Sequence, residues 1–154
     1  MFMNKIQALA NEMKQFFSPQ TVTNVYSICK QLEIEIVEAP IQADAYLECE
    51  NGNSYIVLKE SLNSNRKKFT IVHELGHFYI PWHSELMFGC DIKEMDFKND
   101  YAPREKEANL FAAELLMPMK EFKNHFSGKI CYTTVSELAN IFDVSFQAAL
   151  NRCI

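Results

Sequence analysis

The sequence lacks the cysteine pattern of a disulfide-rich protein or of a cysteine-based zinc site. Its five cysteines are odd in number and widely spaced, and no two of them form a Cys-x-x-Cys pair. We therefore expect mostly buried free thiols in a reducing compartment. Cys90, which follows Gly89 in a polar stretch, is kept as an alternative metal ligand or redox site.

An unbroken apolar run and an excess of basic residues are also missing. Residues 1–17 carry polar or charged side chains every few positions, so they resemble neither a signal peptide nor a membrane span. We expect a cytoplasmic protein that does not bind membranes. With 15 Lys and Arg against 20 Asp and Glu, the formal charge is −5, which disfavours direct nucleic-acid binding because such binding neutralises phosphates.

The composition is that of a folded protein with an aromatic-rich core. Hydrophobic residues make up 48% of the 154 residues, including twelve Phe and six Tyr. No repeat, low-complexity tract or linker interrupts the chain. A length of this size fits one compact domain, which we expect to span residues 1–154.

The first half of the chain predicts two helices followed by three strands. Apolar residues recur at helical spacing over 2–17, and Ser18-Pro19 is expected to end that helix and start a second one reaching about Leu32. Alternation over 34–37 predicts a strand. Two more strands, 45–49 and 55–58, flank Asn51-Gly52, a strong hairpin signal. These strands predict a small antiparallel sheet.

The second half predicts helices around one long loop. Residues 65–80 are mostly apolar and end at Pro81, while a second helix begins near Pro103 and reaches Met117. Between them lies a loop of about twenty residues, longer than usual connections and often functional. Short helices follow, with a capping box at Thr134-x-x-Glu137 and a cap at Ser145. The expected fold class is α+β, mostly helical with a small sheet.

The sequence His73-Glu74-Leu75-Gly76-His77 places an HExxH motif inside the first of these two helices. Residues four apart project from the same helix face, so both imidazoles can bind one metal ion. Glu74 lies about 100° around the helix axis, where it can accept a proton from water and act as general base. Gly76 is expected to keep the approach to the metal free of a side chain.

A catalytic zinc ion needs three protein ligands and an open position, so another segment must supply the third ligand. The helix at 103–117 offers three carboxylates, Glu105, Glu107 and Glu114. Glu107 and Glu114 share a face with Leu110 and Phe111, whereas Glu105 lies about 160° from Glu107 and should face water. We therefore predict Glu107 as the third ligand and Glu114 as the residue that orients a ligand histidine.

The two helices together resemble the ImmA/IrrE family of metallopeptidases. The matching residues are His73-Glu74-Leu75-Gly76-His77 and the run from Glu107 to Pro118, EANLFAAELLMP. The resemblance implies a zincin-like fold that holds one zinc ion on two histidines and the glutamate of the second motif. It also implies cleavage of a helix-turn-helix transcriptional repressor as the function.

A peptidase also needs a hydrogen-bond donor for the oxyanion of the transition state. Many members of the resembled family carry a further histidine four residues after the motif, where this chain has Pro81 and, two positions later, His83. His83 and Tyr101 are predicted to act in catalysis, with Arg104 as another candidate donor. The hairpin at 45–58 is expected to present an edge for an extended substrate.

Two other functions remain open from the sequence. Residues 134–152 resemble a helix-turn-helix, which would make the protein a DNA-binding regulator, although 145–152 offers only one Arg and much apolar surface. Alternatively, the metal site belongs to a binding module without proteolytic activity. That function would require a protein group such as Cys90 or His83 in the fourth coordination position.

Overall fold

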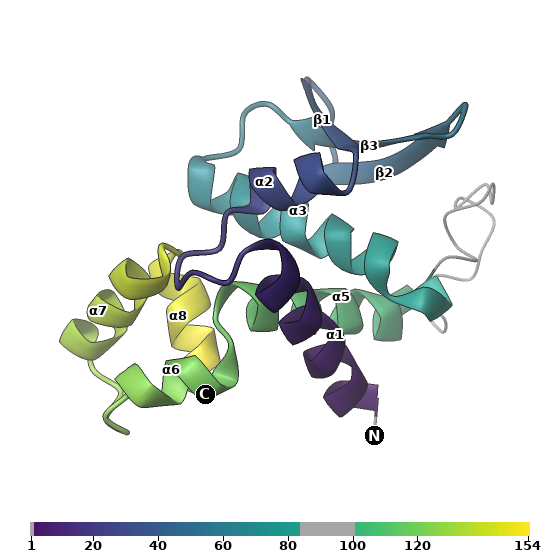
Figure 1. Cartoon of the computed structure of the whole chain (residues 1–154). Helices are drawn as coiled ribbons and strands as arrows, with labels where there is room; N and C mark the ends of the chain where they lie inside the picture. The colour runs from purple at the N-terminus through teal and green to yellow at the C-terminus, as the bar shows by residue number, and fades with distance from the viewer. Residues whose placement is uncertain (1, 84–100) are drawn as a thin grey trace.

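A computed structural model describes residues 2–83 and 101–154, apart from the side chains of residues 2, 101 and 102. The predicted class is confirmed, since helices dominate and one small sheet accompanies them. Figure 1 shows the sheet above α2 and α3, with α1 and α5 beneath them and α6, α7 and α8 at the opposite end from the sheet. The elements in order are α1 (Phe2–Phe17), α2 (Val25–Gln31), β1 (Ile34–Ala39), β2 (Ala45–Glu50), β3 (Asn53–Lys59), α3 (Ser64–Tyr79), η1 (Pro81–His83), α5 (Tyr101–Leu116), α6 (Met119–His125), α7 (Tyr132–Phe142) and α8 (Phe146–Cys153).

The sheet has the order β1-β3-β2 and is mixed. The predicted hairpin is confirmed, because β2 and β3 are antiparallel and Asn51 and Gly52 join them with φ angles of 51° and 79°. The expected all-antiparallel sheet is wrong, because β1 pairs with β3 in parallel. β3 contributes the buried run Ile56–Leu58 and takes the central position, which leaves the more polar β1 and β2 at the edges.

The predicted start of the second helix at Pro19 is wrong, because α2 begins at Val25. The ammonium group of Lys14 donates hydrogen bonds to the Gln20 carbonyl at 2.6 Å and to Thr23 Oγ1 at 2.8 Å. These bonds hold the connection after α1 out of a helix. Asn24 then caps α2, since its side-chain oxygen accepts a hydrogen bond from the Ser27 amide.

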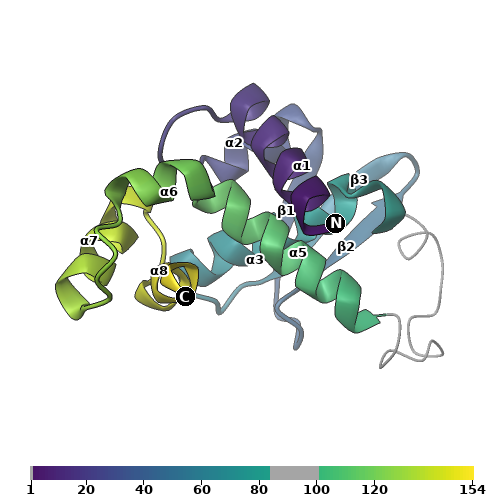
Figure 2. The same ribbon diagram turned by 90° about the horizontal axis from the view of Figure 1, so that it is seen from below.

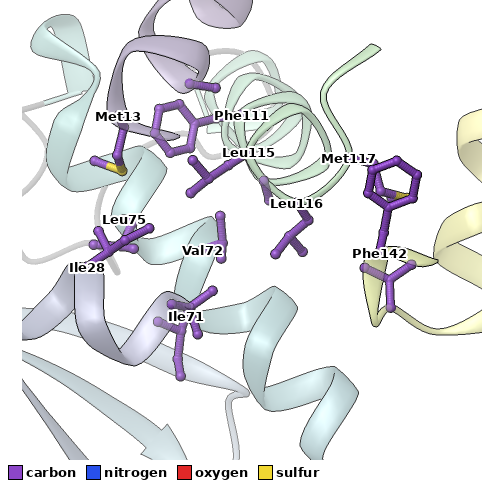
Figure 3. Packing of buried hydrophobic residues seen from close by; sticks show 14 of the residues in the cluster. Met13, Ile28, Ile71, Val72, Leu75, Phe111, Leu115, Leu116, Met117 and Phe142 are labelled. Carbon is purple, nitrogen blue, oxygen red and sulfur yellow. The ribbon is translucent and has the colours of Figure 1, made fainter. Parts of the chain in front are cut away.

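Helix α5 packs against both α3 and α1. In the view from below, Figure 2 shows α5 crossing in front of α3 and lying next to α1. In the core, Phe111 and Leu115 of α5 gather with Val72 and Leu75 of α3 (Figure 3). Gly76 lies where the two helices meet. A Cβ atom there would lie 3.2 Å from the Phe111 ring and 3.3 Å from Ala108 Cα. Gly76 therefore permits close packing of α3 on α5, which corrects the expectation that it clears the approach to a metal.

The C-terminal helices contain one wrong prediction and one confirmed prediction. The capping box at Thr134 is wrong, because α7 already begins at Tyr132 with Cys131 at its N-cap. The cap of the last helix is confirmed, since Ser145 Oγ accepts a hydrogen bond from the Ala148 amide. No helix among the described residues has both the length and the apolar character that a membrane span requires.

Candidate metal centre

His73 and His77 lie one turn apart on α3 and turn their Nε2 atoms toward each other, 3.2 Å apart. Asn63 caps the start of this helix, and the buried side chains Ile71, Val72 and Leu75 hold its opposite face in the core. The predicted placement of the two imidazoles on one helix face is therefore confirmed. Both rings are largely enclosed, with 14% of each side chain exposed.

The carboxylate that meets both imidazoles comes from Glu105 of α5. One of its oxygens lies 2.9 Å from His73 Nε2, and the other lies 2.9 Å from His77 Nε2. Among the described residues, His73, His77 and Glu105 form a group whose ligand atoms all lie within 4.8 Å of one another. The expectation that Glu105 faces water is wrong, and the structure does not place Glu107 at the position predicted for the third ligand.

The rotation of α5 explains this difference. Its most buried face, which includes Ala108, Phe111 and Leu115, packs into the core. The two histidines lie beside that interface, at the wall of a cleft, and the α5 residues that line the cleft are Glu105, Asn109, Leu110 and Ala113. The prediction assumed that the ligand lies on the most apolar face. The site instead uses the neighbouring stripe of residues spaced by one turn.

Asn109 is a site residue that the sequence analysis missed. Its Oδ1 lies 2.8 Å from Nδ1 of His73, on the ring nitrogen that faces away from Glu105. Its spacing of four residues from Glu105 was the available signal. Glu114, predicted for this orienting role, is buried elsewhere, where it pairs with Arg152 and accepts a hydrogen bond from Asn11. That prediction is wrong.

His83 and Glu107 form a second group, which contacts His77 through its Nδ1 atom. His83 Nδ1 lies 2.9 Å from His77 Nδ1, and His83 Nε2 lies 2.8 Å from Glu107 Oε2. His83 forms part of the wall of the cleft but has no exposed surface. The predicted role of His83 as a donor to substrate does not fit this position, because both of its nitrogens already have partners. Burial, more than any other cause, lowers its pKa.

Three other predicted residues add little to this geometry. The side chain of Tyr101 and all of Cys90 lie outside the described residues, so their predicted roles stay predictions. Nη1 of Arg104 is buried and has no hydrogen-bond partner among the described residues. The charge of Arg104 contributes to the lowered pKa of His83.

The charges in the site depend on one another. Burial alone would raise the pKa of Glu105, but its hydrogen bonds to His73 and His77 bring that pKa well below its ordinary value. Burial would likewise lower the pKa of His73, yet the hydrogen bond and charge of Glu105 raise it. For Glu74, burial raises the pKa despite the opposing charges of both histidines. Glu74 therefore has a stronger affinity for a proton than an exposed glutamate.

Two imidazole nitrogens and a carboxylate suit a zinc ion. Zn–N bonds of about 2.0–2.1 Å at tetrahedral angles would separate two ligand atoms by about 3.3–3.4 Å. The observed Nε2 separation of 3.2 Å is close to this value, and the two nitrogen–oxygen separations of 2.9 Å are slightly shorter. The donor set and its spacing therefore fit one small divalent ion.

His73, His77 and Glu105 line a cleft of about 920 Å³. The cleft runs from the edge strand β2, represented by Tyr46 and Leu47, past Glu74 to Ala148 and Asn151 of α8. Glu74 lies between the two histidines in sequence and lines the same cleft as His73, His77 and Glu105. Such a cleft is large enough for several residues of an extended peptide.

Comparison with known proteins assigns the chain to a family. The profile of the peptidase M78 family, described as the IrrE N-terminal-like domain, matches residues 29–153. The chain belongs to this family. The IrrE N-terminal-like region therefore includes α3, α5 and every residue of the centre described above.

Two relatives of this IrrE N-terminal-like chain come from Bacillus or its phage. The "uncharacterized immunity region protein 2" of Bacillus phage phi105 is 30% identical over 108 residues, which are 66% of this chain and 65% of the relative. Metallopeptidase ImmA of Bacillus subtilis strain 168 is 25% identical over 115 residues, 74% of this chain and 66% of the relative. The chain thus spans about two thirds of the length of each.

A Mycobacterium tuberculosis transcriptional regulator shares the fold. It superposes with a TM-score of 0.66 at 14% identity, over 95% of this chain and 45% of the regulator. At that identity the match shows a common fold alone.

Proposed function

We propose that this IrrE N-terminal-like protein is a zinc-dependent endopeptidase of the HExxH class. In this proposal His73, His77 and Glu105 hold the metal, and Glu105 replaces Glu107 as the third ligand. The observation that carries the proposal is the convergence of three ligand atoms from α3 and α5 within 4.8 Å, beside Glu74 and at the wall of a cleft. The name of the relative metallopeptidase ImmA supports the same chemistry.

Zinc, when bound, supplies positive charge that brings the pKa of a coordinated water toward about 7. Glu74 accepts a proton from the attacking water while the new C–O bond forms at the scissile carbonyl. It then returns that proton to the departing amine nitrogen as the C–N bond breaks. The raised pKa of Glu74 suits both steps, because a carboxylate with greater proton affinity is a better base near neutral pH.

The substrate would bind as an extended chain along β2. This strand is at the edge of the sheet, so one side of its backbone has no partner strand within residues 2–83 and 101–154, and residues 43–47 line the cleft. A peptide that pairs with such an edge is held by main-chain hydrogen bonds and is fully extended, as a backbone-cleaving enzyme requires. Apolar side chains of the substrate would lie against Leu110, Ala113 and Ala148, which also line the cleft.

A helix-turn-helix transcriptional repressor is the proposed physiological substrate. The resemblance to the ImmA/IrrE family carries this suggestion, and the name of the phage relative assigns that protein to an immunity region. The protein would act inside the cell, where such a repressor is found.

Direct DNA binding is the alternative that the contacts of α8 argue against. Arg152 is the basic residue of this helix, and its guanidinium group pairs with Glu114 and donates a hydrogen bond to the Met117 carbonyl. Only 7% of its side chain is exposed. A recognition helix must present such groups to phosphates and base edges, so α8 is poorly suited to that role.

The test is cleavage of a co-expressed helix-turn-helix repressor from the same genome, monitored by mass spectrometry with and without a zinc chelator. Glu74→Gln should keep the metal but lose cleavage by about 10²- to 10⁴-fold. Glu137→Gln, on the exposed side of α7, is the matched control and should cleave normally. Cleavage that survives Glu74→Gln would contradict the mechanism. Capture of an uncut repressor by the zinc-loaded protein would favour a binding module, and a shift of operator DNA would favour a regulator.

A further inference from the structure

Each of the two imidazoles in the proposed centre has a partner on its second ring nitrogen. For His73 that partner is Asn109. For His77 it is another imidazole, because His77 Nδ1 lies 2.9 Å from Nδ1 of His83. The His83 ring must itself be held in one orientation. Its other nitrogen, Nε2, lies 2.8 Å from Oε2 of Glu107.

The three residues form a chain of hydrogen bonds with one possible direction. If Nε2 of His77 binds the metal, the neutral ring carries its proton on Nδ1 and must donate to His83. His83 then accepts at Nδ1, so its own proton lies on Nε2 and is donated to the Glu107 carboxylate. Each nitrogen contact is satisfied in this arrangement. Reversal would require the proton of His77 to lie on the nitrogen that binds the metal.

The surroundings restrict all three side chains. His83 has no exposed surface, and its backbone amide donates to the Ile80 carbonyl at 3.0 Å, which ties η1 to the end of α3. The indole nitrogen of Trp82 donates to the same Glu107 oxygen at 2.5 Å. Glu107 thus accepts two hydrogen bonds from η1, and these contacts connect α3, η1 and α5 beside His77.

We propose that His83 and Glu107 are positioning residues that hold the His77 ring with its Nε2 toward the metal. This inference rests on the proposed metal site and assigns a role to two residues that lie outside the ligand set. Partners of ligand histidines contribute about 10- to 100-fold to metal affinity when they are removed one at a time. This chain of hydrogen bonds also explains why Glu107, with 21% of its side chain exposed, points inward to the buried His83.

The experiment compares the zinc affinity of the full chain and its variants by competition with a chromophoric chelator. His83→Phe removes the acceptor of the His77 proton, and Glu107→Ala removes the acceptor of the His83 proton. Each should weaken zinc binding by about 10- to 100-fold. Glu107→Gln keeps an oxygen that can accept from His83 and Trp82, so it should restore most of the affinity lost in Glu107→Ala. Glu137→Ala on α7 is the control for removal of an exposed carboxylate and should bind zinc normally.

A spectroscopic readout separates positioning from simple loss of structure. In the zinc-loaded protein labelled with ¹⁵N, the His77 ring should carry its proton on Nδ1, with slow solvent exchange. His83→Phe should shift that signal and accelerate its exchange. If His83→Phe fails to fold by circular dichroism, the comparison of Glu107→Ala with Glu107→Gln still decides the question.

The outcomes distinguish this proposal from the proposed function. Zinc binding by the wild-type protein that disappears in Glu105→Ala but is unchanged in His83→Phe and Glu107→Ala would overturn the positioning role and leave the peptidase proposal intact. A proton on Nε2 of zinc-loaded His77 would also overturn it. Wild-type protein that binds no zinc would overturn both.

Discussion

Asn109 and His73 form a hydrogen bond across the interface of α3 and α5, with 2.8 Å between Asn109 Oδ1 and His73 Nδ1. Glu105, one turn earlier on α5, lies 2.9 Å from the other nitrogen of the same ring. Two residues of α5 therefore contact both nitrogens of His73. The geometry of the centre depends on the rotation of α5 as much as on the HExxH motif.

Replacement of Asn109 tests this dependence. Asn109→Leu removes the acceptor at similar volume and should weaken zinc binding by about 10-fold or more, because His73 loses the bond that sets its orientation. Asn109→Asp retains an acceptor and should bind zinc close to wild type. Chelator competition measures both variants. Equal affinity in Asn109→Leu and wild type would show that the hydrogen bond has no role in metal binding.

Gly76 should tolerate even a methyl group poorly. Gly76→Ala improves helix propensity by about 1 kcal/mol, but overpacking against Phe111 and Ala108 costs about 1–3 kcal/mol at contacts of 3.2 and 3.3 Å. We expect a net loss of up to about 2 kcal/mol in the free energy of unfolding by urea denaturation. Adding Phe111→Leu should recover part of that loss, since the ring makes the closest contact. A stabilised Gly76→Ala would refute the packing argument.

Near neutral pH, the stability of the metal-free protein and the additional stabilisation by zinc should change with pH in opposite directions. The lowered pKa of Glu105 contributes stability above its ordinary value of 4.5, and this contribution is lost as the pH falls through the lowered folded-state pKa. The raised pKa of His73 contributes stability below its ordinary value of 6.5, and this contribution is lost as the pH rises through the raised folded-state pKa. The pair therefore stabilises the metal-free protein most between these two ordinary values.

Zinc competes with the proton on His73, so zinc affinity should rise with pH until that histidine is deprotonated. Between pH about 6 and 8, heating of the metal-free protein should show decreasing stability, while the stabilisation by zinc increases. Calorimetry with and without zinc measures both trends. A zinc affinity that does not change over this range would exclude His73 as a ligand that must lose a proton.

The buried pair of Glu114 and Arg152 should anchor α8 to α5. Arg152→Met leaves a buried carboxylate without its counter-charge, which should lower the free energy of unfolding by about 3–5 kcal/mol. Combining it with Glu114→Gln should recover part of this loss. Arg66→Met, which breaks the exposed pair with Asp44, is the control and should cost about 0–1 kcal/mol. Urea denaturation of the four proteins is the measurement, and similar losses in both arginine variants would contradict the anchoring role.

Local patterns predicted much of the fold. Asn51-Gly52 identified the hairpin because both residues adopt the positive φ angles that such a turn requires. The spacing of His73 and His77 identified two groups on one helix face. By contrast, the parallel pairing of β1 with β3 and the loop stabilised by Lys14 depend on contacts between segments, which periodicity does not describe.

The third ligand was predicted wrongly for the same reason, because it depends on contacts between two helices. Periodicity placed Phe111 and Leu115 of α5 in the core correctly, but it also assigned Leu110, which lines the cleft, to the same face. The centre lies beside the buried face, so Glu105 and Asn109 point to the two histidines of α3 while Glu107 points to His83. The placement of Glu105 follows from the close approach of α3 and α5 at Gly76 and from the angle between them. Neither quantity is encoded in the spacing of residues within a single helix.

Anomalous diffraction at the zinc absorption edge, on crystals of the zinc-loaded protein, tests the central claim most directly. We predict one peak at about 2.0–2.2 Å from Nε2 of His73, Nε2 of His77 and a carboxylate oxygen of Glu105, with one coordination position open to the cleft. A peak bound by Glu107 instead of Glu105, or an ion whose fourth position is filled by a protein side chain, would contradict it.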